Sequence, residues 1–457
     1  MHTGEIWGYM HNTSQEQAEE ETPVRGRAAS RRGATGKKSG PAKKGKGGGD
    51  STKGLIVGLV AVVAEAGVVP LGPGRAGLEF TERHAADGRR WLFVVNHTDE
   101  DVVVPVTGHD LVADADFPGV VAGRDDPLAV PECRAPAYDE WLVGLGATAR
   151  YATTLELVNP DDGEAVVDVA LSDADGPVEE PALRGIQVPA HGVHRIDLAA
   201  SAPRRELTAA HVTVTRGRVT LTARTTRDQL GRGRVTTDFL PTQAVPDTDN
   251  LILGLPAGAR GASLLVANPG DDEVRARVRL VTAEATFTPT DAPEVAVGPH
   301  AMQEVDLGPL LSGDNGTGVV GLVVESEDPV VASVRLVSRK DLVLLAPAIE
   351  VREPTAAVLP TGEKTLLLGH ALRTGVVHVT SYDADGTVLR EDQVEVAPDR
   401  AASLALPPEA VLVAVEPRNT RIAGVVSMPT GGAQPGLATL RLRPAETHAR
   451  IPVVSPD

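Results

Sequence analysis

Two histidines and an aspartate at close spacing, in His191-Gly-Val-His194-Arg-Ile-Asp197, are the residues of this chain best placed to bind a metal ion. Imidazole and carboxylate groups are ligands that zinc accepts alongside thiolates. The chain repeats this stretch 109 residues further on, and there Gln303 stands where His194 does. Since the copy keeps only two of the three side chains, we interpret the stretch as a turn and strand fixed by structure. We predict no metal ligands.

Two short acidic sequences resemble the opening of a calcium-binding loop: Asp173-Ala-Asp175-Gly and Asp383-Ala-Asp385-Gly. A loop of the EF-hand type also needs a glutamate at its twelfth position. Arg184 and Val394 occupy those positions here. We therefore interpret both sequences as turns, in which aspartate side chains accept hydrogen bonds from nearby amides and the glycine adopts a positive φ. Weak binding of extracellular calcium is the alternative.

The chain lacks the short motifs that mark common catalytic sites. It contains no nucleophile elbow, no phosphate-binding glycine loop, no H-E-x-x-H and no C-x-x-C. Aromatic residues make up only 3% of the chain, which argues against a sugar-binding cleft. We therefore predict no catalytic residues, no cofactor and no enzymatic activity. Paired carboxylates do occur, but in sequences typical of solvated turns: Asp125-Asp126, Asp161-Asp162 and Asp271-Asp272.

The elements that carry these residues are themselves repeated. Asn159-Pro160 recurs as Asn268-Pro269, and Asp197-Leu198 recurs as Asp306-Leu307, each 109 residues later. In both copies an apolar stretch precedes the Asn-Pro pair and a turn-forming acidic sequence follows it. Because proline fixes its own φ and extends the residue before it, we predict a strand–turn–strand corner rather than a binding loop. Arrays of such modules present surface more often than they catalyse.

Strand patterns dominate the chain from Leu78 onward. Val274-Arg-Ala-Arg-Val-Arg-Leu280 alternates apolar and charged residues, which is the period of an antiparallel strand with one solvated face. No stretch shows an amphipathic helical period longer than about two turns. The sequence therefore predicts an all-β fold, with tandem immunoglobulin-like β-sandwich modules after a disordered basic tail and one N-terminal transmembrane helix.

A third, divergent copy of the module lies near the C-terminus, where Asp383-Ala-Asp385-Gly echoes the earlier sequence but the Asn-Pro corner is missing. Trp91-Leu-Phe-Val-Val-Asn96 begins another strand pair upstream. We divide the chain into a disordered basic cytoplasmic tail (1–53), a transmembrane anchor or signal segment (54–71), a divergent β module (78–145), two sandwich repeats (150–245 and 250–350) and a divergent third repeat (355–445).

Charge and hydropathy predict the topology of the N-terminal region. Residues 1–53 carry ten Lys and Arg against six Asp and Glu, and the rest of the chain carries 34 against 56. Positive charge just before the apolar residues 54–71 favours a single-pass anchor with a cytoplasmic N-terminus and an extracytoplasmic body. The first alternative is a signal peptide cleaved near Ala66, after Ala64-Glu65. The second is a buried core element of a cytosolic protein.

The Asn-Pro corners, the basic tail with its apolar segment, and a composition rich in Ala, Val, Gly and Arg together resemble a known group. The chain is similar to the actinobacterial membrane-anchored family of unknown function whose outer part consists of tandem Asn-Pro β modules. The resemblance covers about residues 130–430 and implies an envelope location, with no catalytic residues to transfer. The family commonly has a pair of cysteines in this region. Cys133 is the only cysteine here, so that disulfide is absent.

These observations lead to three hypotheses for function. The first is a non-enzymatic cell-envelope protein, tethered in the membrane, whose sandwiches contact an envelope protein or polysaccharide. The second is a secreted module, released by cleavage near Ala66, that binds a polysaccharide or a protein. The third is an envelope hydrolase whose site has no recognised motif. The acidic body repels phosphate, so no nucleic-acid partner is expected.

Overall fold

The computed structural model describes residues 129–444, apart from 133–135, 160, 162, 191, 232, 234, 257, 339–340, 384–386 and 431–435. It also describes the backbone of a three-stranded antiparallel sheet of order β1-β3-β2, formed by β1 (Gly4–Met10), β2 (Leu78–His84) and β3 (Arg90–Asn96). The apolar residues 54–71, Cys133 and His191 lie outside the described residues. Among the described residues, no helix has the length and apolar character needed to span a membrane.

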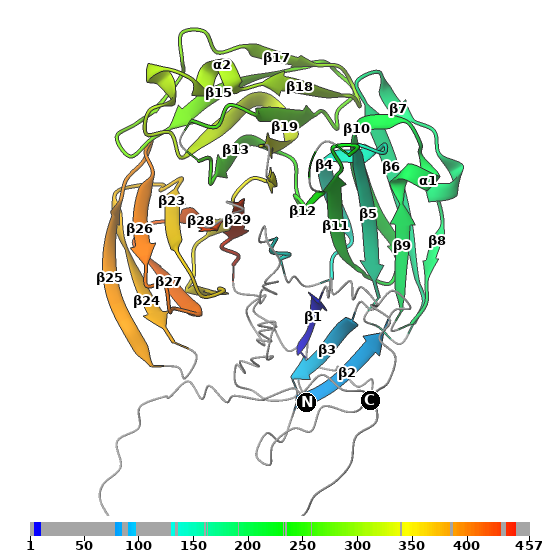
Figure 1. Ribbon diagram of the computed structural model, residues 1–457, viewed down its shortest axis with the longest axis horizontal. Helices are drawn as coiled ribbons and strands as arrows, with labels where there is room; N and C mark the ends of the chain where they lie inside the picture. Colours follow the sequence, from blue (N-terminus) through cyan, green and yellow to red (C-terminus); the bar gives the residue numbers. More distant parts are fainter. Residues whose placement is uncertain are drawn as a thin grey trace, which may run out of the picture.

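Three β-sandwiches follow one another along the chain and are arranged in an arc (Figure 1). The strands of the first are β4 (Asp139–Ala147), β5 (Tyr151–Val158), β6 (Ala165–Asp173), β7 (Gly176–Val178), β8 (Ile186–Val188), β9 (Val193–Asp197), β10 (Arg205–Arg216), β11 (Thr220–Arg227) and β12 (Thr236–Leu240). One layer has the order β4-β10-β6, with β7 and β8 on the outer edge of β6. The other has the order β9-β5-β11-β12. A short helix, α1 (Leu198–Ser201), follows β9.

The second sandwich repeats this pairing pattern. Its elements are β13 (Asp247–Leu253), β14 (Ala262–Ala267), β15 (Val274–Val281), β16 (Thr286–Phe287), β17 (Glu294–Val297), β18 (Met302–Asp306), α2 (Gly308–Leu311), β19 (Gly321–Val337) and β20 (Leu342–Leu345). The long strand β19 serves both layers, because its first part pairs with β13 and β15 and its last part pairs with β14 and β20. Alternate residues of β15 are buried and its arginines face outward, as the sequence predicted.

The third sandwich has the same pattern with one simplification. Its strands are β21 (Glu350–Val351), β22 (Thr355–Val358), β23 (Lys364–Gly369), β24 (Gly375–Tyr382), β25 (Val388–Val396), β26 (Ala402–Leu406), β27 (Leu412–Arg418), β28 (Ile422–Thr430) and β29 (Gly436–Arg441). The layers have the orders β22-β27-β24-β25 and β26-β23-β28-β29. A single continuous β25 replaces the two short edge strands of the earlier sandwiches. The prediction of an all-β, sandwich-like chain is confirmed.

The first sandwich begins earlier than the sequence division placed it. Strand β4 begins within the segment 78–145, but it pairs with β10 as β13 pairs with β19. A glycine with a left-handed backbone also occurs in β4 and directly after β13: Gly144 at φ 108° and Gly254 at φ 98°. Side-chain types differ so much between β4 and β13 that the 109-residue match does not reveal their equivalence.

The Asn-Pro corners are buried clamps. The side-chain amide of Asn268 donates to the carbonyls of Asp272, Val297 and Gly298 at 2.7–3.2 Å, and its oxygen accepts from the amide of Gly270. Asn159 makes the same four contacts in the first sandwich. Each asparagine therefore holds its own turn against the end of a distant edge strand, which confirms that the corners are structural.

Each sandwich also completes its core with residues from outside that sandwich. Leu342 and Leu344, at the start of the last strand of the second sandwich, pack in the core of the first. Leu437 of β29 packs against the core of the second. The core of the third receives Val130, which precedes the first sandwich in the chain. The three cores are thus linked in a ring, and the segment ahead of the first sandwich closes it.

Two buried carboxylates reinforce this arrangement. Asp238 of β12 accepts the amide hydrogen of Leu344 at 2.7 Å, and Asp341 accepts that of Leu437 at 2.8 Å. Burial raises the pKa of Asp341 to about 6 and raises the pKa of Asp238 well above its usual range, although the amide hydrogen bonds act in the opposite direction. Each carboxylate therefore joins one sandwich to the last strand of the next.

A buried ion pair fixes residues 129–132, the segment that closes the ring (the closing segment). The guanidinium of Arg441 donates to both carboxylate oxygens of Glu132 at 2.6 Å, and both side chains are only 4% exposed. Arg441 also donates to the carbonyls of Thr242 and Pro347, which lie in the connections between consecutive sandwiches. Arg443 adds a further contact to Glu132 at 3.2 Å. Arg441, in the last strand, thus hydrogen-bonds to the closing segment and to both connections between sandwiches.

We predict that replacing Asn268 by alanine lowers the free energy of unfolding by about 2–4 kcal/mol, because the carbonyls that it caps lose their donors inside the protein. Urea denaturation of the purified protein measures this change. Asp271→Asn is the matched control, since that neighbouring carboxylate is 94% exposed and should change the free energy by less than about 0.5 kcal/mol. Equal effects of the two substitutions would show that the corner is not a clamp.

We predict that Glu132→Gln destabilises the protein by about 3–5 kcal/mol, because it leaves a buried arginine without its counter-charge. Hydrogen exchange should accelerate in the third sandwich and in residues 129–132 before it does so in the interior of the first two. Glu273→Gln removes a partner of the exposed Arg275 and should cost at most about 1 kcal/mol. Unchanged exchange in the third sandwich would contradict closure by this pair.

Candidate functional site

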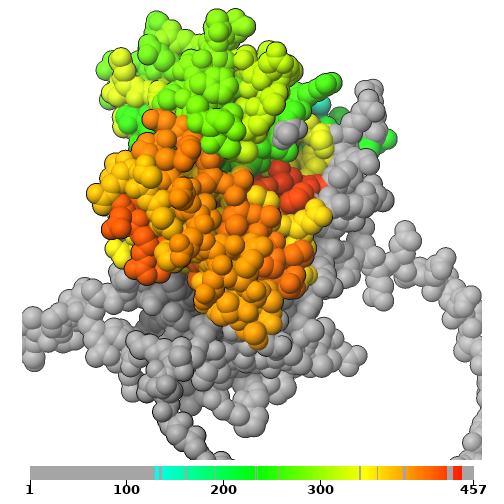
Figure 2. All heavy atoms as spheres, turned by 90° about the vertical axis from the view of Figure 1, so that its left-hand side faces the viewer, coloured from blue at the N-terminus to red at the C-terminus, as the bar shows by residue number. Residues whose placement is uncertain are grey.

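A cleft of about 140 Å³ lies between the second and third sandwiches. Figure 2 shows these two sandwiches in direct contact, with described residues of both at the surface along their border. Strands β13, β15 and β19 supply one wall of the cleft, and the turns after β23 and before β26 supply the other. Its lining combines charged and apolar side chains of Asp249, Leu251, Arg279, Val281, Thr286, Val323, His370, Ala371, Pro398, Asp399 and Arg400.

The apolar part of the lining is the outer edge of a packed contact. Leu251, Val281 and Val323 of the second sandwich cluster with Leu367 and Ala401 of the third. These side chains are at most 6% exposed, so the cluster excludes water and fixes the two walls relative to each other. The cleft is therefore bounded by a rigid interface and not by two independent domains.

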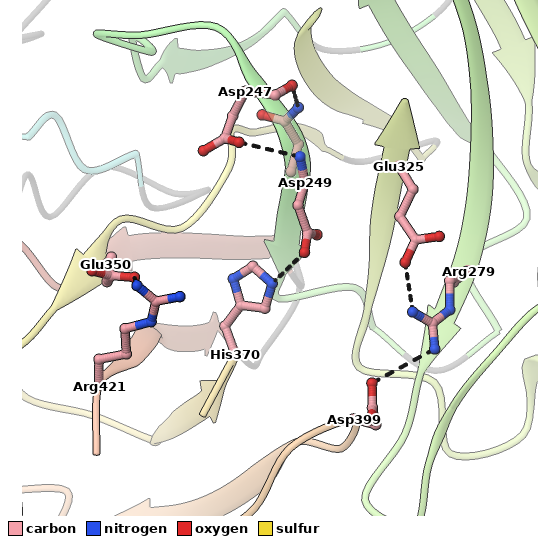
Figure 3. A network of polar contacts seen from close by, with 9 residues as sticks. Asp247, Asp249, Arg279, Glu325, Glu350, His370, Asp399 and Arg421 are labelled. Atoms are coloured by element: carbon pink, nitrogen blue, oxygen red, sulfur yellow. Dashed lines mark hydrogen bonds and ion pairs between the residues drawn. The ribbon is translucent and has the colours of Figure 1, made fainter. Parts of the chain in front are cut away.

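One wall-to-wall contact joins a histidine to a carboxylate. His370 Nε2 lies 3.0 Å from Asp249 Oδ2, and the two side chains point toward each other from facing sandwiches (Figure 3). His370 has a left-handed backbone conformation with φ 57°. The hydrogen bond to Asp249 raises the pKa of His370 above its ordinary value, while burial and the charge of Arg421 oppose this effect. The pair therefore favours the imidazolium form.

A second pair across the cleft is looser. Arg279 Nη1 donates to Glu325 of its own sandwich at 2.5 Å, and its Nη2 lies 3.7 Å from the carboxylate of Asp399 in the third (Figure 3). That separation is longer than a hydrogen bond allows. The Asp399 side chain is 74% exposed. Arg400, beside it, is exposed and makes no ion pair with any residue that the structure describes. The cleft thus offers charged groups of both signs to solvent.

The contact between the first two sandwiches shows why this cleft is open. There Trp141 of β4 stacks on His211 of β10, with ring centroids 3.8 Å apart, and Trp141 packs on the apolar cluster of that interface. Strand pairing places Leu251 and Val323 at the same positions, because Trp141 pairs with His211 and Leu251 pairs with Val323. Two aliphatic side chains fill less space than two stacked rings.

The third sandwich contributes His370 and Asp399 to the cleft from positions that are occupied differently in the earlier repeats. His370 directly follows β23, as Asn268 directly follows β14. Asp399 occupies the left-handed turn before β26, with φ 56°, as His300 does before β18, with φ 51°. The clamp residue of the repeat has therefore been replaced by a half-exposed histidine that turns to the neighbouring sandwich.

The described aspartates singled out from the sequence lie elsewhere and hold turns or cap a helix, whereas Asp385 is outside the described residues. Asp173 Oδ1 accepts the amide hydrogen of Asp175, and Asp383 Oδ1 accepts that of Thr387. Asp197 caps α1 by accepting from the amide of Ala199. His191 is outside the described residues, and within those residues no three His, Cys, Asp or Glu side chains are grouped as metal ligands. The turn interpretation of the aspartate sequences agrees with these contacts.

Sequence reasoning did not single out the cleft residues. Its alignment of the third repeat relied on the Asp-Ala-Asp-Gly sequence and noted only that the Asn-Pro corner is missing. The available signal was the identity of the replacement, His370, at a position where the other two copies keep asparagine. The facing Asp249 and Arg279 could not be connected to it, because no sequence pattern indicates which strands of the neighbouring sandwich face that turn.

We predict that the stability of the protein decreases as the pH rises through the folded-state pKa of His370. Because this pKa is raised above the unfolded value of about 6.5, the stabilising contribution is complete below pH 6.5 and is lost above the folded pKa. Urea midpoints measured from pH 5.5 to 8.5 test this, and Asp249→Asn should flatten the dependence. Asp314→Asn, an exposed carboxylate on the 3-10 helix Asp314–Gly316, should leave it unchanged. An unaltered profile in Asp249→Asn would contradict the assignment.

Comparison with known proteins identifies a family but indicates no reaction or ligand. A stretch of 60 residues is 40% identical to a beta-galactosidase of Arthrobacter sp, which is 13% of this chain and 9% of the galactosidase. The chain therefore spans only a small part of that enzyme. No solved structure matches the chain. The model of a family described as a "Family of unknown function (DUF5719)" matches residues 119–407, from ahead of the closing segment to the end of β26, and the chain belongs to this family.

Proposed function

We propose that this protein is a non-enzymatic component of an actinobacterial cell envelope, held in the membrane by residues 54–71 and presenting its β array outside. The observation that supports this most is the closure of the array by Glu132 and Arg441. An array that serves as a binding surface needs a fixed arrangement of its modules. The buried ion pair and the shared cores supply that arrangement without a ligand.

The closing segment also suits a tethered protein. Residues 129–132 are the described part of the three-sandwich array nearest in sequence to the apolar segment, and they lie where the connections between sandwiches converge. A tether attached there leaves the outer faces of all three sandwiches free. The strongly acidic composition of the body is consistent with a partner that carries positive charge.

We infer that the partner is an extended segment of another envelope protein, added to a sheet edge. Strand β25 is a nine-residue strand on the outer side of the third sandwich (Figures 1 and 2), and among the described strands it pairs with β24 alone. Its exposed side chains include Glu391 and Glu395. A long edge strand can accept a further strand through its backbone, and these carboxylates favour a basic one.

Protease shaving of intact cells that express the chain with a C-terminal tag tests the topology. We predict that the tag fractionates with membranes and is lost on shaving, since the body is outside and anchored. A variant without residues 54–71 is the matched control, and its tag should remain in the cytosol and be protected.

Three other outcomes would redirect the interpretation. A tag found mainly in the culture medium would favour the secreted module cleaved near Ala66. A tag of the intact chain that stays cytosolic and protected would contradict both envelope hypotheses. Turnover of an envelope glycan or of a β-galactoside, abolished by changing one carboxylate, would favour the hydrolase.

A further inference from the structure

We propose that the cleft between the second and third sandwiches is a binding site for a small zwitterion, an α-amino acid with a small aliphatic side chain. This goes beyond the proposed envelope function and does not depend on where the protein resides. The cleft is about 140 Å³, roughly ten times the volume of about 10–15 Å³ that one water molecule needs. It is smaller than the pockets of about 300–1,000 Å³ that hold drug-sized molecules.

The charge balance of the lining selects a zwitterion. Arg279 and Arg400 carry positive charge, Asp249 and Asp399 carry negative charge, and His370 is already paired with Asp249. A cation bound to Asp399 would add nothing for Arg279, which keeps Glu325, and an anion bound to Arg279 would leave Asp399 without that arginine. A ligand with both charges can give its carboxylate to the arginine and its ammonium to Asp399. Two charge-assisted hydrogen bonds then replace a contact of 3.7 Å.

The groups that would engage the ligand differ in how firmly they are placed. Arg279 is oriented by Glu325 and by the carbonyl of Thr286, to which its Nη2 donates at 3.1 Å. Because these two contacts fix the guanidinium and the Arg279 side chain is still 26% exposed, a ligand can reach it without a rearrangement of the side chain. Asp399 and Arg400 are exposed on the turn before β26 and can close over a ligand by changing side-chain rotamers. The site is thus preformed on one wall and adjustable on the other.

The apolar floor determines the kind of amino acid. Leu251, Val281 and Val323 line the cleft beneath the charged rim, and Ala371 lines the facing wall. A methyl or isopropyl group can pack on this floor, in the space that stacked rings fill in the contact between the first two sandwiches. A long charged side chain would bring a charge against this apolar floor, so we expect selection against it.

Titration of the purified full-length protein with alanine, monitored by NMR and calorimetry, tests the proposal. Alanine amide lacks the carboxylate and N-acetylalanine lacks the ammonium, so they serve as matched probes. We expect alanine to bind and to shift resonances of residues 370–371 and 398–400, and both blocked compounds to bind at least about tenfold more weakly.

Three substitutions connect any binding to the cleft. Asp399→Asn and Arg400→Gln change exposed side chains and should each weaken alanine binding by about tenfold. Leu251→Trp restores the ring found at Trp141 and should abolish binding by filling the space. The controls are Asp271→Asn and Arg275→Gln, which alter exposed charges of the second sandwich that do not line the cleft.

The results separate the proposal from its rivals. No binding of alanine at tens of millimolar, equal binding of all three probes, or binding unaffected by Asp399→Asn and Arg400→Gln would each overturn it. Preference for N-acetylalanine would indicate an anion site, and preference for the amide a cation site, and either would also overturn it. Because these measurements use purified protein, their failure would leave the topology experiment on cells unaffected.

Discussion

The contact between Glu132 and Arg441 is the constraint on which the rest of the array depends. Sandwiches in tandem need only touch their neighbours, and nothing in such an arrangement holds the first near the last. Here the segment before the first sandwich fills the core of the third, and the ion pair fixes it there. Since the same arginine donates to both connections between sandwiches, the relative positions of all three are set at one buried point.

In the first two repeats, the corner asparagine that holds a turn is the same, whereas positions at the contacts between sandwiches differ. Asparagine at the corner is retained in the first two sandwiches because three carbonyls need its amide hydrogens. Positions that face the next sandwich differ between the first two copies, and both contacts are packed. Stacked Trp141 and His211 seal one interface, whereas Leu251 and Val323 leave space at the other. The site therefore arises where the repeat has diverged, on a framework that has not.

Much of the architecture could be predicted from the chain. Alternation in β15, the 109-residue repeat and the Asn-Pro corners follow from local rules about burial and turns, and these predictions agree with the structure. The residue at which the first sandwich begins could not be predicted as well. Strand β4 shares its role with β13 but few of its side chains, so only backbone pairing reveals it.

The sequence by itself determined the all-β, sandwich-like class and the strand–turn–strand corners, because each depends on neighbours within one strand or one turn. Only the tertiary structure decided how the sandwiches are joined. Glu132 and Arg441 are more than three hundred residues apart, and His370 meets Asp249 from a different sandwich. Contacts of this kind depend on how finished modules pack, and no spacing along the chain encodes them.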